Sequence, residues 1–248
     1  MIRARKRFGQ HFLTDQSAIA RIHDVLAIQP NDRLVEIGPG RGALTSELVK
    51  ATSQLTLIEL DRDFADDLKT RFPNAELLSM DVLDVPLDTF VARRVVGNLP
   101  YNISTPLLLY LLEEPRIVDM HFMLQKEVAL RLAAAPGEKA WGRLSVMAQY
   151  QCQIQPLFAV PARSFRPVPK VESMFVRFKP VTPKQTANDF QTYANVVKTA
   201  FSQRRKTLAN SLSNYRIAWE KLGLDARMRA DHASVNDYVS IANHVDAQ

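Results

Sequence analysis

The sequence predicts an α/β fold in which a mostly parallel sheet with an antiparallel edge is followed by a small all-α domain. Five short apolar runs between residues 33 and 125 alternate with helix-length segments, an order typical of a parallel sheet covered on both faces. Two later runs, at 145–151 and 173–178, are expected to form the antiparallel edge. From residue 183 onward the apolar spacing is only helical.

The spacing of apolar residues defines the elements of the first domain. Asp15 can cap a helix that Pro30 would end, and the apolar positions of this helix are Ile19, Ile22, Val25 and Leu26. The expected parallel strands are 33–37, 55–60, 75–80, 93–97 and 120–125. A further helix is expected to start at Ser104 or Thr105, because Pro106 suits the first turn of a helix.

Prolines mark the boundary between the two expected domains. Six of them lie between residues 156 and 183, and clusters of proline are typical of connecting segments. We therefore expect a first domain over residues 1–182, which begins with a basic segment at 1–13, and a helical domain over residues 183–248.

Composition favours a soluble, basic protein of a reducing compartment. The net charge is +6, and residues 183–248 hold nine Lys and Arg against six Asp and Glu, which suggests a polyanionic partner. Cys152 is the only cysteine, so a disulfide framework and a cysteine-built zinc site are excluded, and we expect no metal site. The basic start lacks the apolar core of a signal peptide, and no apolar run could cross a membrane. The cytoplasm is the expected location.

A glycine-rich loop follows the first expected strand. It reads EIGPGRG over residues 36–42, and Glu59 lies 19 residues after Gly40 at the end of the second strand. Such a loop with a carboxylate at this distance can hold the ribose of NAD, FAD or S-adenosyl-L-methionine. A carboxylate at Glu36 would repel a pyrophosphate and suit a cationic ligand. Asp81 can bind an adenine amino group or simply cap a helix.

The segment NLPY, Asn98 to Tyr101, follows the fourth strand at the edge where parallel sheets bind ligands. The amide oxygen of Asn98 and the carbonyl of Leu99 can accept hydrogen bonds from an adenine N6 amine, with Pro100 fixing their direction. Tyr101 can stack on the base. The chemistry expected here is methyl transfer to this amine, although the same four residues also suit a plain turn.

Seven motifs together resemble one family, the ribosomal RNA adenine N6-dimethyltransferases, and within it the bacterial small-subunit (16S) branch. They occur in family order and read KRFGQHFL (6–13), EIGPGRGALT (36–45), IELDRD (58–63), NLPYNIST (98–105), MLQKEVALRL (123–132), FRPVPKVES (165–173) and AFSQRRKTLANSL (200–212). The resemblance implies a Rossmann-like class I methyltransferase fold that uses S-adenosyl-L-methionine. It also implies dimethylation of two adjacent adenosines in the 3′-terminal hairpin loop of 16S rRNA, within an immature small ribosomal subunit.

The resemblance also implies residue roles. Cofactor contacts are expected from Gln10, His11, Leu13, Glu36, Gly38, Gly40, Glu59, Asp81 and Asn98. The target amine would be held by Asn98, Leu99, Pro100 and Tyr101, and Phe165 would pack on the flipped base opposite Tyr101, although a core position suits Phe165 as well. RNA contacts are expected from Arg3, Arg5, Lys6, Arg7, Lys170, Arg204, Arg205 and Lys206. Within one helix over 200–212, Arg204 and Arg205 would flank an apolar stripe.

Three other functions compete with this interpretation. A large-subunit rRNA methyltransferase would share the loop and the NLPY segment, but both ends of the chain resemble the small-subunit branch. A DNA adenine methyltransferase more often carries DPPY or NPPY. In a non-catalytic RNA-binding assembly factor, either the glycine loop or the NLPY segment would be expected to have lost its key residues. Both are complete here. No sequence feature demands an oligomer, so we expect a monomer.

Overall fold

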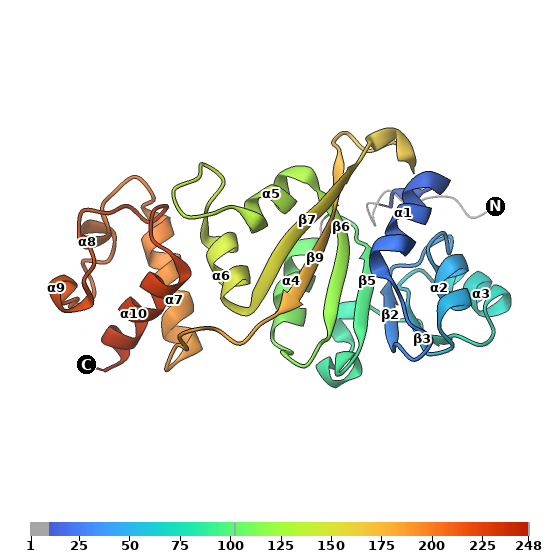
Figure 1. Cartoon of the computed structure of the whole chain (residues 1–248), viewed down its shortest axis with the longest axis horizontal. Coiled ribbons are helices and arrows are strands. Elements are labelled where there is room, and N and C mark those ends of the chain that lie inside the picture. Colours follow the sequence, from blue (N-terminus) through green and yellow to red (C-terminus); the bar gives the residue numbers. More distant parts are fainter. Residues whose placement is uncertain (1–9, 102, 248) are drawn as a thin grey trace. The chain divides into compact units, whose positions relative to one another are not determined.

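A computed structural model describes residues 10–101 and 103–247, and its central feature is a twisted sheet (Figure 1). Within the described residues the sheet has seven strands in the order β4-β3-β2-β5-β6-β9-β7. Their bounds are β2 Leu34–Ile37, β3 Leu55–Ile58, β4 Glu76–Leu78, β5 Arg94–Asn98, β6 Asp119–Gln125, β7 Cys152–Val160 and β9 Ser173–Pro180. Strands β2 to β6 pair in parallel, whereas β9 runs antiparallel to β6. The predicted parallel sheet with an antiparallel edge is confirmed.

Helices join most of the successive parallel strands, as expected for this class of fold. The joining helices are α2 Thr45–Ala51, α3 Arg62–Arg71 and α4 Ser104–Leu112, while the short 3-10 turns η2 Val82–Asp84 and η3 Leu87–Phe90 join β4 to β5. Helix α1 Gln16–Leu26 precedes β2, α5 Lys126–Ala133 follows β6, and the 3-10 turn η4 Ala162–Ser164 follows β7. Two short strands, β1 Phe12–Leu13 and β8 Phe165–Arg166, form a small antiparallel ladder of their own.

The first helix shows how local sequence sets an element. The Asp15 carboxylate accepts hydrogen bonds from the backbone N–H groups of Ser17 and Ala18 at 3.0 and 3.3 Å, which confirms the predicted N-cap. The helix ends at Leu26 because Ala27 adopts a left-handed conformation, with φ of 44°. The helix therefore ends before Pro30, the residue expected to end it. Val25, one of its expected apolar positions, is exposed.

The chain forms two compact units. One consists of the chain up to Ala129 together with Ile154–Pro180, and the other of Leu130–Gln153 together with the chain from Val181. The chain passes from the first unit to the second for the last time after Pro180, close to the expected division after residue 182. The expected division, however, placed residues 130–153 in the first domain. This segment joins the second unit because Trp141, Val146 and Tyr150 are buried in the core of that unit.

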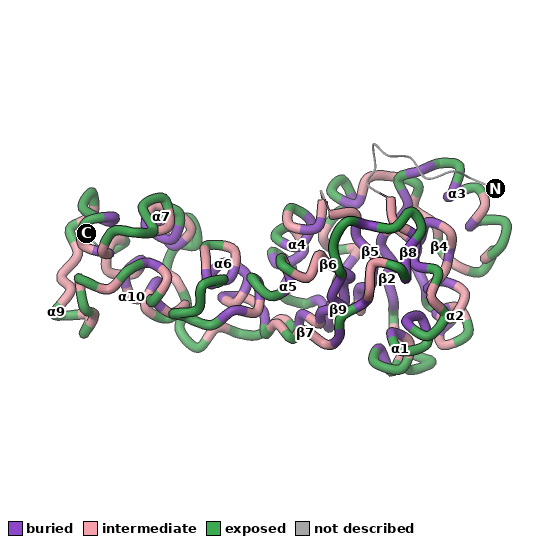
Figure 2. Tube along the Cα trace, turned by 90° about the horizontal axis from the view of Figure 1, so that it is seen from above, coloured by how far each residue is buried: buried purple, intermediate pink, exposed green. Residues whose placement is uncertain are grey.

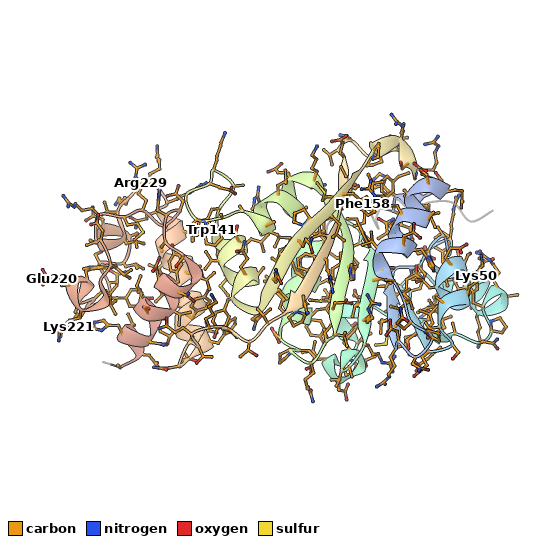
Figure 3. All side chains as sticks on the ribbon, in the orientation of Figure 1. Lys50, Trp141, Phe158, Glu220, Lys221 and Arg229 are labelled. Atoms are coloured by element: carbon orange, nitrogen blue, oxygen red, sulfur yellow. The ribbon has the colours of Figure 1, made fainter. Side chains whose placement is uncertain are left out.

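The first unit has its core around the sheet. Figure 2 shows buried residues concentrated along the central strands, and all four residues of β2 and all four of β3 are buried. At the border of this core the Arg21 guanidinium lies 4.1 Å from the ring centre of Phe158, which is labelled in Figure 3. Strands β2 and β3 are therefore held by packing on both faces.

The second unit is helical. Its helices are α6 Arg143–Gln151, α7 Phe190–Ser202, α8 Leu208–Ser211, α9 Trp219–Leu222 and α10 Val235–Asp246. Trp141, labelled in Figure 3, is fully buried, and its indole N–H donates to the Ala233 carbonyl at 3.0 Å. The predicted all-helical pattern beyond residue 183 is confirmed.

The expected strand over 145–151 is wrong, because these residues form α6. Val146 and Tyr150 are four positions apart and both buried, which is helical spacing. The Ser145 hydroxyl accepts from the Gly142 N–H at 3.1 Å and so supports the helix start. The strand next to β9 is instead β7, which includes Pro156. Proline fits there because β7 is the last strand of the sheet.

The single helix expected over 200–212 is also wrong. Helix α7 ends at Ser202 and α8 begins at Leu208, with a turn between them. At the start of α8, the N–H groups of Leu208 and Ala209 donate to the carbonyls of Met228 and Ala226. These long-range bonds satisfy donors that a continuous helix would have used internally.

None of the helices in the described residues is both long and apolar enough to cross a membrane. No group of three or more His, Cys, Asp or Glu side chains in that part of the chain could hold a metal ion.

Candidate active site

A cavity lies at the carboxyl ends of the parallel strands in the first unit. Its walls include Gly38 and Gly40 after β2, Glu59 after β3, Asp81 after β4 and the segment Asn98–Tyr101 after β5. The sequence therefore predicted the right edge of the sheet, and the structure brings residues from four strand ends together there. Open α/β sheets bind ligands at this edge.

The glycine loop takes the conformation that its glycines allow. Gly38 and Gly40 have φ of +66° and +54°, which most other residues adopt only with strain. A Cβ atom added to Gly40 would lie 2.9 Å from the Phe12 ring. Gly40 is therefore needed for both the turn and the close approach of the N-terminal segment.

Glu59 joins the glycine loop to the next strand. Its two carboxylate oxygens accept the N–H groups of Gly40 at 2.9 Å and of Asp61 at 2.8 Å. Burial raises the pKa of Glu59, and these two backbone hydrogen bonds oppose the rise. Each oxygen keeps a second lone pair, so the residue fits the predicted binding of ribose hydroxyls while it also shapes the loop.

Asp81 fits both of its predicted roles at once. One carboxylate oxygen accepts from the Leu83 N–H at 3.0 Å and caps η2. The residue also lines the cavity. A carboxylate has about four acceptor positions, so the cap leaves acceptor capacity for an adenine amino group.

The expected role of Glu36 needs correction. The Thr45 hydroxyl donates to its carboxyl group at 2.6 Å, and Glu36 is only 2% exposed. Burial raises the pKa of Glu36 to about 8, with the Thr45 bond opposing the rise and the charge of Glu59 adding to it. Glu36 is not among the residues that line the cavity. A carboxyl group that is covered and does not line the cavity is not placed to select a cationic ligand in the predicted way.

The N-terminal segment forms one wall of the cavity. Gln10, His11 and Phe12 line it, and β1 pairs with β8 in the register Phe12 to Arg166 and Leu13 to Phe165. Leu13 is 4% exposed and packs in the core. Gln10 and His11 therefore line the same cavity as the glycine loop, as predicted. Leu13 lies in the core and does not line the cavity.

Asn98 is oriented by this wall. Its side-chain nitrogen donates to the His11 carbonyl at 2.8 Å. This bond uses one of the two N–H donors of the amide and turns the nitrogen towards His11, so the amide oxygen points away from His11, and this oxygen can only accept hydrogen bonds. Gly97 precedes it, and a Cβ there would lie 2.7 Å from the Ile37 carbonyl oxygen, so glycine permits the close approach of β5 to β2.

Tyr101 lines the same cavity, and both its hydroxyl and its ring contact neighbouring side chains. Its hydroxyl lies 3.0 Å from the Ser173 hydroxyl on β9, and its ring centre lies 5.8 Å from that of His11, with 30° between the planes. Neither contact was predicted. Ser173 ends the FRPVPKVES motif quoted from the sequence, so its position beside a conspicuous loop was the available signal.

Phe165 does not occupy its expected place. It is 1% exposed and belongs to the core cluster of the first unit, and it is not a cavity-lining residue. The ladder between β1 and β8 sets it opposite Leu13. The prediction that Phe165 packs on a flipped base is therefore not supported, and its role is that of a core anchor.

The predicted RNA-binding residues fall into three groups. Arg3, Arg5, Lys6 and Arg7 lie outside the described residues. Lys170, Arg205 and Lys206 are exposed. Arg204 instead makes contacts within its own unit, since it donates to the Lys139 carbonyl at 2.8 Å and lies 3.3 Å from an Asp231 carboxylate oxygen.

A family model described as ribosomal RNA adenine dimethylase matches residues 1–247. The chain belongs to this family. It is accordingly an S-adenosyl-L-methionine-dependent methyltransferase with the class I fold, as predicted. The cavity suits that cofactor, because a glycine cradle that a Cβ would fill lies beside the Glu59 carboxylate.

Two curated relatives are each named ribosomal RNA small subunit methyltransferase A. The one from Chromohalobacter salexigens is 49% identical over 257 residues, covering 98% of this chain and 91% of the relative. The one from Nitrosococcus oceani is 49% identical over 253 residues, covering 98% and 96%. The chain therefore matches these two relatives over nearly their whole length.

Two solved structures share the fold over almost the whole chain. A dimethyladenosine transferase from Plasmodium falciparum has a TM-score of 0.81 at 24% identity and covers 93% of this chain and 96% of its own. The 23S rRNA methyltransferase ErmE has a TM-score of 0.76 at 27% identity and covers 95% and 99%.

Proposed function

We propose that this protein transfers methyl groups to N6 of two adjacent adenosines in the 3′-terminal hairpin loop of 16S rRNA, two groups to each. The observation that carries the proposal is the orientation of Asn98, whose nitrogen is bound by the His11 carbonyl. Its oxygen is thereby left as an acceptor in a cavity shared with the glycine loop and Glu59.

The residues around Asn98 address the main difficulty of the reaction. The lone pair of an adenine N6 amine is delocalised into the ring, so the amine is a weak nucleophile. Acceptors at the Asn98 amide oxygen and the Leu99 carbonyl draw both N–H bonds into fixed directions and favour a pyramidal amine. Pro100 restricts the backbone that carries the second acceptor.

Tyr101 holds the base in place for this chemistry. Its hydroxyl is fixed by Ser173 and its ring lines the cavity, so an extruded adenine has an aromatic surface on which to stack. When bound, S-adenosyl-L-methionine supplies an electrophilic methyl group. The chain itself contributes orientation, which is a large part of catalysis when two reactants must be aligned.

No strong base is required among these residues. An amine that has gained a methyl group carries a positive charge and loses its proton readily to water or to a nearby acceptor. The Asn98 and Leu99 oxygens can guide that proton without holding it. Release of the proton restores a neutral amine that can be methylated a second time in the same place.

The small subunit is the favoured substrate over the large subunit. The two curated relatives at 49% identity carry small-subunit names, whereas the large-subunit enzyme ErmE is 27% identical. We further propose that the protein acts in the cytoplasm, as a monomer, on an immature small subunit. The net charge of +6 supports a polyanionic partner, and the single cysteine suits a reducing compartment.

The test is transfer of labelled methyl groups from S-adenosyl-L-methionine to unmethylated small subunits, with large subunits as a parallel substrate. We expect label in small-subunit RNA only. Label confined to the large subunit would identify a large-subunit enzyme, and binding to small subunits without transfer would identify an assembly factor.

A further inference from the structure

Two exposed valines lie on the connection between β8 and β9. Val168 is 55% exposed and Val171 is 44% exposed, and both belong to the segment 167–172. Single exposed apolar side chains are common on protein surfaces. Two within four residues on one loop of the active-site unit suggest a partner surface, and the remaining contacts of the loop identify its kind.

The loop is held at both ends. The His11 imidazole Nδ1 lies 2.7 Å from the Pro167 carbonyl oxygen at one end. At the other end, Lys126 Nζ donates to the Glu172 carboxylate at 2.8 Å, and the Lys126 N–H donates to the Glu172 carbonyl at 3.0 Å. Pro169 is buried between the two valines. Both valines therefore stay exposed instead of folding back onto the protein.

The first of these anchors, and the residue that follows the loop, connect it to the cavity. His11, which contacts Pro167, lines the cavity and contributes the carbonyl that orients Asn98. Ser173 directly follows the loop and bonds the hydroxyl of Tyr101. A ligand seated against Tyr101 therefore has the loop close by.

The charges around the valines favour RNA as the partner. Lys170 lies between them and is exposed, and Arg163 and Arg166 are exposed just before the loop. The one carboxylate of the loop, Glu172, is neutralised by Lys126. Apolar groups among cations suit the stacked bases and phosphates of a nucleic acid.

We propose that Val168 and Val171 form an apolar wedge that packs against the bases next to the target adenosine and stabilises its extruded position. Extrusion uncovers the faces of neighbouring bases, and apolar side chains that insert at such steps replace the lost stacking. Phe165 cannot serve here because it is buried in the core. The wedge rests on the proposed function, since it requires an extruded adenosine.

The experiment compares two double variants in single-turnover methyl transfer to saturating amounts of unmethylated small subunits. Val168→Thr with Val171→Thr keeps side-chain shape but makes both surfaces polar, and Val168→Ile with Val171→Ile keeps them apolar. Val118→Thr is the matched control, because Val118 is 50% exposed but precedes β6 at its amino end. Thermal unfolding and cofactor affinity are measured for every variant.

We expect the threonine pair to slow transfer at least tenfold with unchanged cofactor affinity, and the isoleucine pair and Val118→Thr to react at the wild-type rate. Wild-type rates for the threonine pair, or equal losses in both pairs, would overturn the wedge alone. Absence of transfer by the wild-type protein would overturn the proposed function and the wedge with it.

Discussion

Glu59 and Tyr101 come from different strand ends but line one cavity, and the structure gives them separable tasks. Glu59 holds the glycine loop through the Gly40 N–H, whereas Tyr101 offers a ring surface fixed by Ser173. We therefore propose that Glu59 serves the cofactor and Tyr101 the target base.

If the two tasks are separate, one variant should lose cofactor affinity and the other should lose methyl-transfer rate. Glu59→Ala is expected to weaken cofactor binding at least tenfold, because the loop loses its carboxylate. Tyr101→Ala is expected to slow transfer about 10- to 100-fold with little change in cofactor binding, since stacking on an aromatic ring contributes about 1–3 kcal/mol. Cofactor titration and single-turnover transfer measure the two effects. Tyr101→Phe is the control, as it keeps the ring; equal losses of binding and transfer in either alanine variant would refute these roles.

The buried carboxyl group of Glu36 is expected to make the free energy of unfolding depend on pH. Its pKa rises from 4.5 to about 8 because the folded protein buries it. The folded state therefore holds the proton more tightly, so the stability contribution is complete below pH 4.5 and is lost as pH rises towards 8. A shift of this size corresponds to an upper limit of about 5 kcal/mol.

Glu36→Gln is expected to flatten the pH dependence between pH 5 and 8.5, because the amide can still bond to Thr45 but cannot ionise. Urea unfolding across that range measures the slope. Glu47→Gln, which changes an exposed carboxyl group of α2, should keep the wild-type slope. A slope in Glu36→Gln as steep as that of the wild type would mean that another group is responsible.

At the scale of elements, the glycine loop and β1 are fitted to each other. Gly38 and Gly40 both have positive φ, but a Cβ would meet the Phe12 ring only at Gly40, whereas nothing lies within 4 Å at Gly38. The two positions therefore separate backbone strain from contact with the N-terminal wall.

Gly38→Ala is expected to cost about 1 kcal/mol of stability from backbone strain, with a small effect on the cofactor. Gly40→Ala adds displacement of Phe12, so we expect a further loss of stability and a markedly lower cofactor affinity. Thermal unfolding and cofactor titration of the two variants measure this. Identical behaviour of both alanine variants would show that the Phe12 contact is unimportant.

Elements defined by local pattern were predicted well. The parallel strands carry continuous apolar runs, and Asp15 caps α1 through bonds to its own first turn. The run at 145–151 failed because its seven residues suit either a strand or a helix, and the outcome depends on packing within the second unit. The helix break after Ser202 depends on bonds to residues 226–228, which no local pattern contains.

Local sequence pattern also predicted only part of the candidate site. Gly38, Glu59, Asp81 and Asn98 all line the cavity because each lies at the end of a strand, and strand ends meet at one edge. Their roles towards the cofactor stay predictions. Burial decided the cases that failed: Glu36 has its carboxyl group covered beside Thr45, and Phe165 lies in the core. The sequence indicates that such residues matter but not which way their side chains point.

At the scale of the whole molecule, each of the two units has a core of its own and they carry different surfaces. The cavity belongs to the first unit. In the second unit the turn after α7 exposes Arg205 and Lys206, while Arg204 is engaged by Asp231. We propose that Arg205 and Lys206 bind rRNA phosphates.

Reversing these two charges, Arg205→Glu with Lys206→Glu, is expected to weaken binding to small subunits at least tenfold and to reduce its salt dependence. Cofactor affinity should not change. Lys221→Glu serves as a control cation of the same unit, located on α9 and labelled in Figure 3. A binding curve identical to wild type at every salt concentration would exclude this turn as a phosphate contact.

We propose that the Asn98–Tyr101 segment positions each of two adjacent adenosines for two successive methylations. Mass spectrometry of small-subunit RNA after complete reaction tests it most directly, with the positions of modified nucleosides read from nuclease fragments. We expect N6,N6-dimethyladenosine at two neighbouring positions of the 3′-terminal hairpin loop and nowhere else. A single modified position, or a product that stops at one methyl group, would contradict it.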